Sequence, residues 1–403
     1  MTLKARISPA DRATALLLAA GAFSAAFGYL WGLIAARFMP PAEYADFTAS
    51  SSILYFVVIV AAPLSQSVAY FAASRDRNEA LAIASTVERR VVGYGVVATL
   101  LLCIASPSIA RAGHFRTPYP LVAVFVASLL FAILSVRRGV VQGESRFGPL
   151  AANTFLEAVF RLTAMLAACF WLPRADVGIA THALAAVIAT LLLPFPHTRA
   201  PVSLGPVWRY LASALGATAM YAAFLNTDVV LARIFFPAAD AATYGAASFL
   251  ARASAMLVTP FYVFAIPHLA EARNDPDDLR RRFLRICAQY TALSAAAVIA
   301  IAILRRQLVA VLLGSAYANA QTLLVPISVA IAIGGLAFIV CQLPMTVGSF
   351  RFVPWYAAAY VGEIMAVSMW HTTLLRVVYI VIAAQLVALA VIAFHARVKP
   401  LAQ

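Results

Sequence analysis

Five ionisable side chains lie inside long apolar stretches of this 403-residue sequence. They are Glu157, Arg161, Asp228, Arg252 and Glu363. On insertion scales, a charge at the centre of a membrane helix costs about 2.5–3.5 kcal/mol, so these side chains should face a protein interior or a water-filled cavity. A buried arginine can bind an anionic group through paired hydrogen bonds, and a carboxylate in a region of low dielectric can take up and release a proton. The sequence therefore predicts anion binding and proton binding within apolar helices.

Helical spacing places three polar residues of the first half on one face. Asn153, Glu157 and Arg161 follow one another at intervals of four residues, which makes a single stripe on an α-helix. Two interpretations stay open. Glu157 and Arg161 either pair with each other and only stabilise the helix, or they line a cavity and bind a ligand.

A second stripe with the same spacing, Tyr244, Ser248 and Arg252, occurs in the second half. Arg252 lies near the middle of its apolar run. It either faces a cavity as an anion-binding side chain or forms a buried pair with Asp228 or Glu363.

Asp228 lies nearer to the end of its own apolar run, where water is closer. Besides a part in proton or helix-gating chemistry, it has a purely local interpretation. In that interpretation it bridges Asn226 and Arg233 on the same helix.

A third polar face carries Tyr356, Tyr360 and Glu363. Glu363 has no cation three or four residues away, whereas Glu157 has Arg161 at that spacing. Because burial disfavours an unpaired charge, Glu363 is the better candidate for binding and releasing a proton, and Glu157 for a fixed ion pair. The alternative is that both carboxylates only hold helices together.

The composition explains where these stripes lie. The chain is 64% hydrophobic and only 11% charged, with a mean hydropathy of +0.89. A water-soluble fold of this size cannot bury so much apolar surface. The sequence therefore predicts an all-α, polytopic membrane protein. The net charge of +14 does not indicate a nucleic-acid partner, because the basic residues lie mainly between apolar runs.

The remaining reactive side chains predict neither a cofactor nor a metal. The four cysteines lie in apolar runs without metal-ligand spacing, and the six histidines are scattered. No GxxxxGK[ST] motif occurs, so the chain carries no P-loop ATPase of its own.

Twelve apolar runs are long enough to be considered as spans. They lie near 13–36, 48–73, 91–110, 119–142, 149–172, 178–194, 208–234, 242–269, 286–304, 321–342, 352–372 and 375–396. With the N-terminus inside, cytoplasmic segments hold 20 Lys and Arg residues and external loops hold 8. This asymmetry predicts that both termini are cytoplasmic. The densest cytoplasmic segment is expected to be a loop over 271–285, where Arg280, Arg281, Arg282 and Arg285 would also attract anionic membrane lipid.

The two halves of the sequence resemble each other. Matches occur in the same order at offsets of 196–205: residues 36–41 with 232–237, Pro63 with Pro260, Arg89 and Tyr94 with Arg285 and Tyr290, and 143–149 with 348–354. An even number of spans in each repeat predicts halves of the same orientation, related by a pseudo-two-fold axis along the membrane normal. We therefore expect an N-terminal lobe over 1–200 and a C-terminal lobe over 201–403, each with six helices.

The repeat also relates individual candidate residues. Tyr55 is the counterpart of Arg252 at an offset of 197. Pro63 and Pro260 interrupt equivalent helices, where each removes a backbone hydrogen bond. Paired kinks are plausible hinges for alternating access. The alternative is ordinary helix curvature.

Several segments resemble those of Wzx-type polysaccharide flippases, a group in the multidrug/oligosaccharidyl-lipid/polysaccharide (MOP) exporter superfamily. Residues 37–47 read RFMPPAEYADF and are similar to the end of that family's first helix. Residues 139–162 resemble its junction between helices 4 and 5, and residues 226–252 resemble its helix 7–8 signature. Residues 312–324 resemble the segment before its helix 10. One departure is Ala45, where the family usually has glycine.

The resemblance implies a V-shaped pair of six-helix lobes in the bacterial inner membrane. It also implies translocation of an oligosaccharide linked to polyprenyl diphosphate, with glycosyltransferases and a polymerase of the same pathway as further partners. The candidate substrate-binding residues are then Arg161, Arg252, Tyr55, Ser248 and Tyr360. The candidate coupling or gating residues are Glu363, Glu157, Asp228, Pro63 and Pro260.

Other classes fit the sequence less well. A major-facilitator carrier usually has a glycine-containing basic loop after its second helix, and residues 74–90 lack those glycines. Many multidrug antiporters use a carboxylate in the first helix, and 13–36 contains none. The lipid II flippase branch normally has two extra helices. A membrane polymerase or glycosyltransferase would need a large external loop or a carboxylate cluster at the membrane edge, so no enzyme is predicted.

Overall fold

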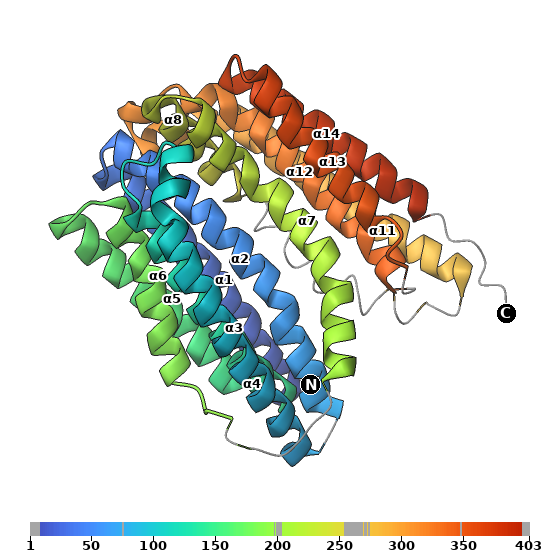
Figure 1. Cartoon of the computed structure of the whole chain (residues 1–403). Helices are drawn as coiled ribbons and strands as arrows, with labels where there is room; N and C mark the ends of the chain where they lie inside the picture. Colours follow the sequence, from blue (N-terminus) through green and yellow to red (C-terminus); the bar gives the residue numbers. More distant parts are fainter. Residues whose placement is uncertain are drawn as a thin grey trace, which may run out of the picture. The chain divides into compact units, whose positions relative to one another are not determined.

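The computed structural model describes residues 9–74, 76–196, 198, 204–253, 269, 272, 275–346 and 349–396. Within these ranges the chain forms twelve α-helices and no strand (Figure 1). The first half contains α1 (Pro9–Phe38), α2 (Pro41–Ser74), α3 (Arg77–Ala112), α4 (Tyr119–Gly143), α5 (Phe147–Trp171) and α6 (Ala175–Leu191). The second half contains α7 (Gly205–Phe235), α8 (Ala238–Ala251), α11 (Pro276–Leu308), α12 (Ala320–Thr346), α13 (Val353–Trp370) and α14 (Leu374–His395). The predicted all-α class is confirmed.

Nine helices of the described chain are long and apolar enough to cross a membrane. α6 is a shorter apolar helix, and α8 and α13 do not meet the same criteria of length and hydropathy. Eleven of the twelve predicted runs each coincide with one described helix. The twelfth, 242–269, begins as α8 and continues beyond the described residues. The chain is a multi-pass membrane protein.

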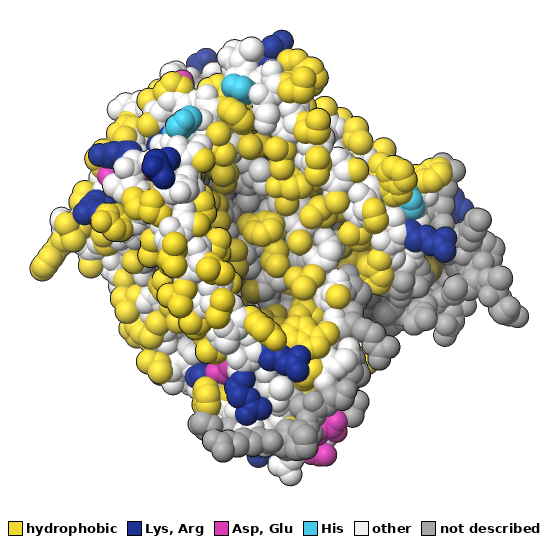
Figure 2. All heavy atoms as spheres, in the orientation of Figure 1, with side chains coloured by type: hydrophobic (Ala, Val, Ile, Leu, Met, Phe, Trp, Pro, Cys, Tyr) yellow, Lys and Arg dark blue, Asp and Glu magenta, His cyan; other side chains and the backbone are white. Residues whose placement is uncertain are grey.

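The surface agrees with this assignment. Figure 2 shows hydrophobic side chains over most of the visible face, with Lys and Arg side chains in smaller groups. Trp171 and Trp370 end α5 and α13, and they are 85% and 54% exposed. Exposed tryptophan at a helix end is typical of the membrane–water interface.

The start of α11 differs from the sequence prediction. Asp275 caps the helix by accepting hydrogen bonds from the backbone N–H groups of Asp277 and Asp278, each at 3.0 Å. Pro276 occupies the first helical position, where its missing N–H has no cost. The four arginines between 280 and 285 are therefore helical, and the expectation of a loop as far as Arg285 is wrong. The cap at Asp275 and the proline that follows it start the helix here, although the segment carries several charges.

The chain folds as two compact units. Unit 1 comprises Met1–Met39, Val57–Arg111 and Arg116–Ala214, and unit 2 comprises Pro40–Phe56, Ala112–Phe115 and Leu215–Gln403. In unit 1, α1 packs on α5, and α6 packs on both α4 and α5. In unit 2, α12 packs on α8, α11 and α14, and α13 packs on α14. The lobe boundary near residue 200 stays a proposal, because α2 and α7 each contribute residues to both units.

Close packing positions the polar faces within each unit. In unit 1, a Cβ on Gly139 of α4 would lie 2.7 Å from the carbonyl oxygen of Ser65 on α2, so only glycine permits this approach. In unit 2, Phe224 of α7 stacks on Tyr356 of α13, with ring centroids 5.2 Å apart. The same phenylalanine meets Tyr360 edge-on at 5.5 Å. These contacts hold the polar face of α13 against α7.

Candidate functional site

Glu157 lies between two arginines in unit 1. Its Oε1 accepts a hydrogen bond from Nη1 of Arg161 at 2.9 Å, and its Oε2 lies 3.6 Å from Nη2 of Arg138. Arg161 also donates to the carbonyl oxygen of Ser24 on α1 at 3.2 Å. Glu157 is 3% exposed and Arg161 is 7% exposed. The pair expected from the four-residue spacing is therefore present, but it belongs to a larger group.

Asn153 extends this group toward α6. Its Oδ1 accepts from Nε of Arg138 at 2.9 Å, and its Nδ2 donates to the carbonyl oxygen of Ala189 at 2.7 Å. We define the N-terminal polar cluster as Arg138, Asn153, Glu157 and Arg161. Arg138 was not predicted as a site residue, because the basic pair at 137–138, near the end of the apolar run 119–142, was counted with the cytoplasmic residues.

The N-terminal polar cluster has an excess of positive charge. Two guanidinium groups share the single carboxylate of Glu157. Nη2 of Arg138 and Nε of Arg161 are buried without a hydrogen-bond partner among the described residues. Buried donors without acceptors are costly. The cluster is therefore suited to accept an anionic group.

A second group surrounds Asp228 in unit 2. Its Oδ2 accepts a hydrogen bond from the hydroxyl of Tyr244 at 2.9 Å, and its Oδ1 lies 3.6 Å from Nη2 of Arg252. Arg252 donates to the carbonyl oxygen of Leu225 at 2.7 Å and to Oγ of Ser52 at 3.3 Å. The buried pair of Arg252 with Asp228, one of the two interpretations left open above, is present.

The local interpretation of Asp228 is wrong. Asn226 donates to the carbonyl oxygen of Ala222 at 2.7 Å. Arg233 donates to Asp46. Asn226 and Arg233 each have another partner, so Asp228 does not bridge them.

Glu363 is 1% exposed, and neither of its carboxylate oxygens has a hydrogen-bond partner among the described residues. On the same helix, the hydroxyl of Tyr360 lies 2.7 Å from the hydroxyl of Thr227. We define the C-terminal polar cluster as Asp228, Tyr244, Arg252 and Glu363, because Glu363 interacts electrostatically with Asp228 and Tyr244. With all its charges formed, it holds two carboxylates and one guanidinium, which is the opposite imbalance to that of the N-terminal polar cluster. One proton on Glu363 would make it neutral.

The other predicted residues occupy less distinctive places. Ser248 is buried on α8 and Tyr55 is half-buried on α2. Pro63 lies inside α2, where its carbonyl oxygen accepts from Oγ of Ser67 at 2.7 Å. Pro260 lies outside the described residues. Their roles stay proposals.

Sequence analysis also missed two buried ion pairs. In unit 1, Arg137 donates to Oε1 of Glu88 at 2.8 Å from Nη2 and at 3.1 Å from Nε. In unit 2, Nε of Arg233 donates to Oδ1 of Asp46 at 2.7 Å. Arg233 also lies 5.7 Å from the ring centroid of Phe115. The repeat was the available signal for Arg233, since residues 232–237 match 36–41.

Among the residues described, no group of three or more His, Cys, Asp or Glu side chains could hold a metal ion.

Buried arginines and carboxylates within long apolar helices mark a functional site inside the membrane. Solved structures share the fold that holds this site. The chain superimposes on an inward-facing multidrug resistance MATE family transporter of the MOP superfamily with a TM-score of 0.75 and 12% identity, over 95% of this chain and 97% of that one. It superimposes on the lipid II flippase MurJ, inward closed conformation, with a TM-score of 0.74 and 9% identity, over 96% and 88%. For a MOP superfamily transporter from Pyrococcus furiosus the values are 0.65 and 14%, over 97% and 96%.

The family follows from the sequence match. The family model described as "Polysaccharide biosynthesis protein" matches residues 34–322. The chain therefore belongs to the polysaccharide biosynthesis protein family, and it has the MOP superfamily fold. No curated protein matches the sequence. The three structural relatives are two transporters and a flippase, and none is described as an enzyme.

Proposed function

We propose that this protein flips an oligosaccharide linked to polyprenyl diphosphate across the bacterial inner membrane, by alternating access, for the assembly of a cell-surface polysaccharide. The family description and the similarity to a lipid II flippase support a lipid-linked saccharide as the substrate class. The observation that carries the proposal is the buried excess of guanidinium groups around Glu157. A diphosphate is strongly anionic and must cross about 30 Å of hydrocarbon. Buried arginines lower that barrier, because they stay charged and bind phosphate oxygens bidentately.

Each unit contributes one principal cation. Arg161 of the N-terminal polar cluster and Arg252 of the C-terminal polar cluster contact the diphosphate or acidic sugars during translocation. Tyr55, Ser248 and Tyr360 supply hydroxyl groups for the saccharide. Pro63 and Pro260 act as hinges.

Proton uptake at the C-terminal polar cluster couples transport to a gradient. Glu363 is the titrating carboxylate, because it is buried with no hydrogen-bond donor among the described residues. Asp228 is a gating residue. When the substrate binds Arg252, Asp228 loses this ion pair and takes up a proton instead. Glu157 keeps the arginines of the N-terminal polar cluster in place.

The topology and partners follow from the same proposal. Both termini are cytoplasmic, and the lipid-linked substrate is made by glycosyltransferases on that face. A polymerase receives it on the other face.

Purified protein in proteoliposomes tests the flipping activity. The probe is a polyprenyl diphosphate carrying a fluorescent disaccharide, and a membrane-impermeant reductant reports how much of it faces outward. We expect the inner pool to become accessible much faster with native protein than in protein-free liposomes. Equal rates would overturn the proposal.

A second candidate function is export of small cationic drugs coupled to an ion. It is favoured by the TM-score of 0.75 with a MATE family transporter and by the two carboxylates of the C-terminal polar cluster, which would suit a cation. Ethidium in the same proteoliposomes separates the candidates. Transport of ethidium without flipping of the lipid would identify an exporter.

A further inference from the structure

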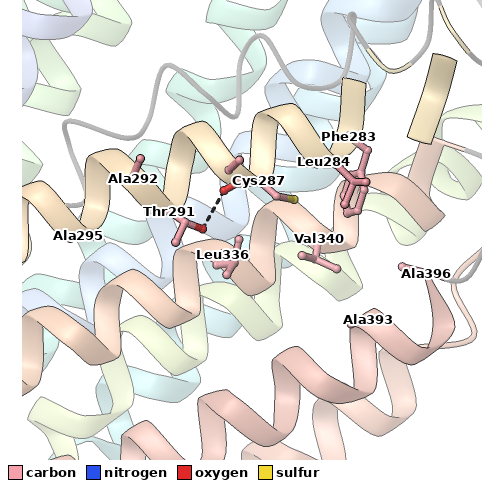
Figure 3. Close-up of a pocket in the computed structure, with 11 residues that line it drawn as sticks. Phe283, Leu284, Cys287, Thr291, Ala292, Ala295, Leu336, Val340, Ala393 and Ala396 are labelled. Carbon is pink, nitrogen blue, oxygen red and sulfur yellow. Dashed lines mark hydrogen bonds between the residues drawn. The ribbon is translucent and has the colours of Figure 1, made fainter. Parts of the chain in front are cut away.

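Unit 2 has an apolar groove between α11, α12 and α14, with a volume of about 750 Å³. Figure 3 shows its walls: Phe283, Cys287 and Ala292 lie along α11, Val340 lies on α12 and Ala393 lies on α14. On α11 the lining residues run from Phe283 to Ala295, which is about 18 Å along a helix. The groove is therefore elongated along the helix axis.

The lining of the groove favours a hydrocarbon occupant. Small side chains on α11, among them Ala288, Ala292 and Ala295, leave room beside the helix. Thr291 is the one hydroxyl in the lining, and it donates to the carbonyl oxygen of Cys287 at 2.8 Å (Figure 3). The Thr291 hydroxyl is therefore already hydrogen-bonded within α11, and it needs no polar ligand as a partner. An apolar chain would bind by area burial and packing alone.

The cytoplasmic turn of α11, defined as residues 280–285, places positive charge at one end of this groove. Arg280 and Arg281 are exposed; Arg280 lies three residues before Phe283, and Arg281 lies three residues before Leu284. That spacing puts them on the same helix face, one turn beyond the apolar lining. The groove thus continues from hydrocarbon-lined walls to a basic end.

Nearby carboxylates leave much of this charge available. Asp275 caps the helix through backbone N–H groups, and Asp278 pairs with Arg282 at 2.8 Å. Arg280 and Arg285 have no carboxylate within 4 Å among the described residues, and Arg281 contacts only a backbone carbonyl oxygen at 3.4 Å. Exposed arginines at the membrane surface attract anionic headgroups.

We propose that this groove binds part of the isoprenoid chain of a polyprenyl diphosphate, with the diphosphate held against Arg280 and Arg281. The inference rests on the proposed function and adds a binding place for the lipid part of the substrate. Apolar walls and a basic end match a long hydrocarbon chain that carries two linked phosphates at one end. The groove and its basic end hold the lipid before translocation, and the diphosphate then leaves Arg280 and Arg281 for the buried arginines.

Photocrosslinking tests the groove directly. A photoreactive benzoylphenylalanine replaces Ala292 in the full-length protein, and the control replaces Ala300, an exposed residue of α11 outside the groove. The probe is radiolabelled polyprenyl diphosphate without sugar, in vesicles of zwitterionic lipid. We expect several-fold more label at position 292 than at 300. Unlabelled polyprenyl diphosphate should compete for it, and phosphatidylglycerol should not.

The basic end has its own matched control. Arg280→Ala with Arg281→Ala should lower the crosslinking at 292 several-fold. Arg305→Ala with Arg306→Ala removes two exposed arginines at the opposite end of α11 and should leave it unchanged. Equal labelling at 292 and 300, or full competition by phosphatidylglycerol, would show an ordinary membrane lipid in the groove and overturn the proposal.

Failure of the groove and failure of the proposed function give different results. Ala292→Trp fills the groove, and Ala300→Trp adds the same bulk outside it. If the parent flips the fluorescent lipid and Ala292→Trp flips it equally well, the groove proposal is wrong and the flippase stands. If position 292 crosslinks specifically but no flipping occurs, the groove stands and the proposed function is wrong.

Discussion

Arg233 and Asp46 form a buried ion pair of 2.7 Å, although 187 residues separate them in the chain. Both belong to unit 2, where the pair joins the N-terminal part of α2 to the end of α7. Arg233 is 4% exposed and Asp46 is 1% exposed. Such a pair is costly to disrupt, because removing one partner leaves the other charge buried and uncompensated.

We expect Asp46→Ala and Arg233→Ala each to lower the free energy of unfolding by about 3–5 kcal/mol. The double variant should lose less than the sum, because it leaves no unpaired charge. Thermal unfolding of the purified protein in detergent measures both effects. The control is the partly exposed pair Arg174–Asp176 at 2.9 Å. Arg174→Ala should cost no more than about 1 kcal/mol. Additive losses in the double variant would show that the two side chains are not coupled.

Substitution of Arg252 should separate transport from folding. Arg252→Ala removes the cation beside Asp228, and we expect polysaccharide export to be lost while the amount of protein in the membrane stays unchanged. Arg252→Lys should restore part of the activity, because lysine keeps the charge but lacks the bidentate donor geometry. Export is measured in cells and abundance by immunoblotting.

Two comparisons make the Arg252 result interpretable. Arg305→Ala, at an exposed arginine of α11, should export normally. If Arg252→Ala reduces abundance, the double variant with Asp228→Asn removes the uncompensated charge and should recover it without recovering export. Normal export by either variant would exclude a transport role for Arg252.

The two buried glutamates should respond differently to neutralisation. Glu363→Gln resembles the protonated side chain, so binding of the lipid-linked probe should persist while stimulation of flipping by a pH gradient is lost. Glu157→Gln leaves Arg138 and Arg161 without their shared carboxylate, so it should reduce stability by about 3–5 kcal/mol and impair binding. Proteoliposomes with an imposed pH gradient measure the first effect, and thermal unfolding measures the second. A Glu363→Gln variant that still responds to the gradient would remove Glu363 from the coupling role.

Reporter fusions test the orientation. The excess of Lys and Arg in predicted cytoplasmic segments predicts that alkaline phosphatase fused after Gln403 is inactive. A fusion at Gly113, between α3 and α4, should be active, because this turn is predicted to be external. Activity at the C-terminus would contradict the cytoplasmic placement. Equal expression of both fusions by immunoblotting is the control.

The sequence by itself determined the helices and the local side-chain pairs. Apolar runs predicted the positions of eleven described helices, because a backbone in hydrocarbon must satisfy its hydrogen bonds internally. The pairing of Glu157 with Arg161 was one of two interpretations of their spacing, since positions four residues apart are neighbours on any α-helix. The family resemblance rested on such local segments, and the family model confirmed it.

Only the tertiary structure decided which helices supply the other partners. Arg138, near the end of the apolar run 119–142, was counted with the cytoplasmic residues and lies beside Glu157. Arg233, near the end of the run 208–234, was counted with the external residues and pairs with Asp46. Arg252 meets both Asp228 and Ser52, which lies 200 residues away. Helical periodicity says which side chains share a face, but it carries no information about which helix that face meets. The partner helix is determined by close packing between distant segments, such as the approach of α4 to α2 at Gly139. This packing depends on all the helices of the unit together.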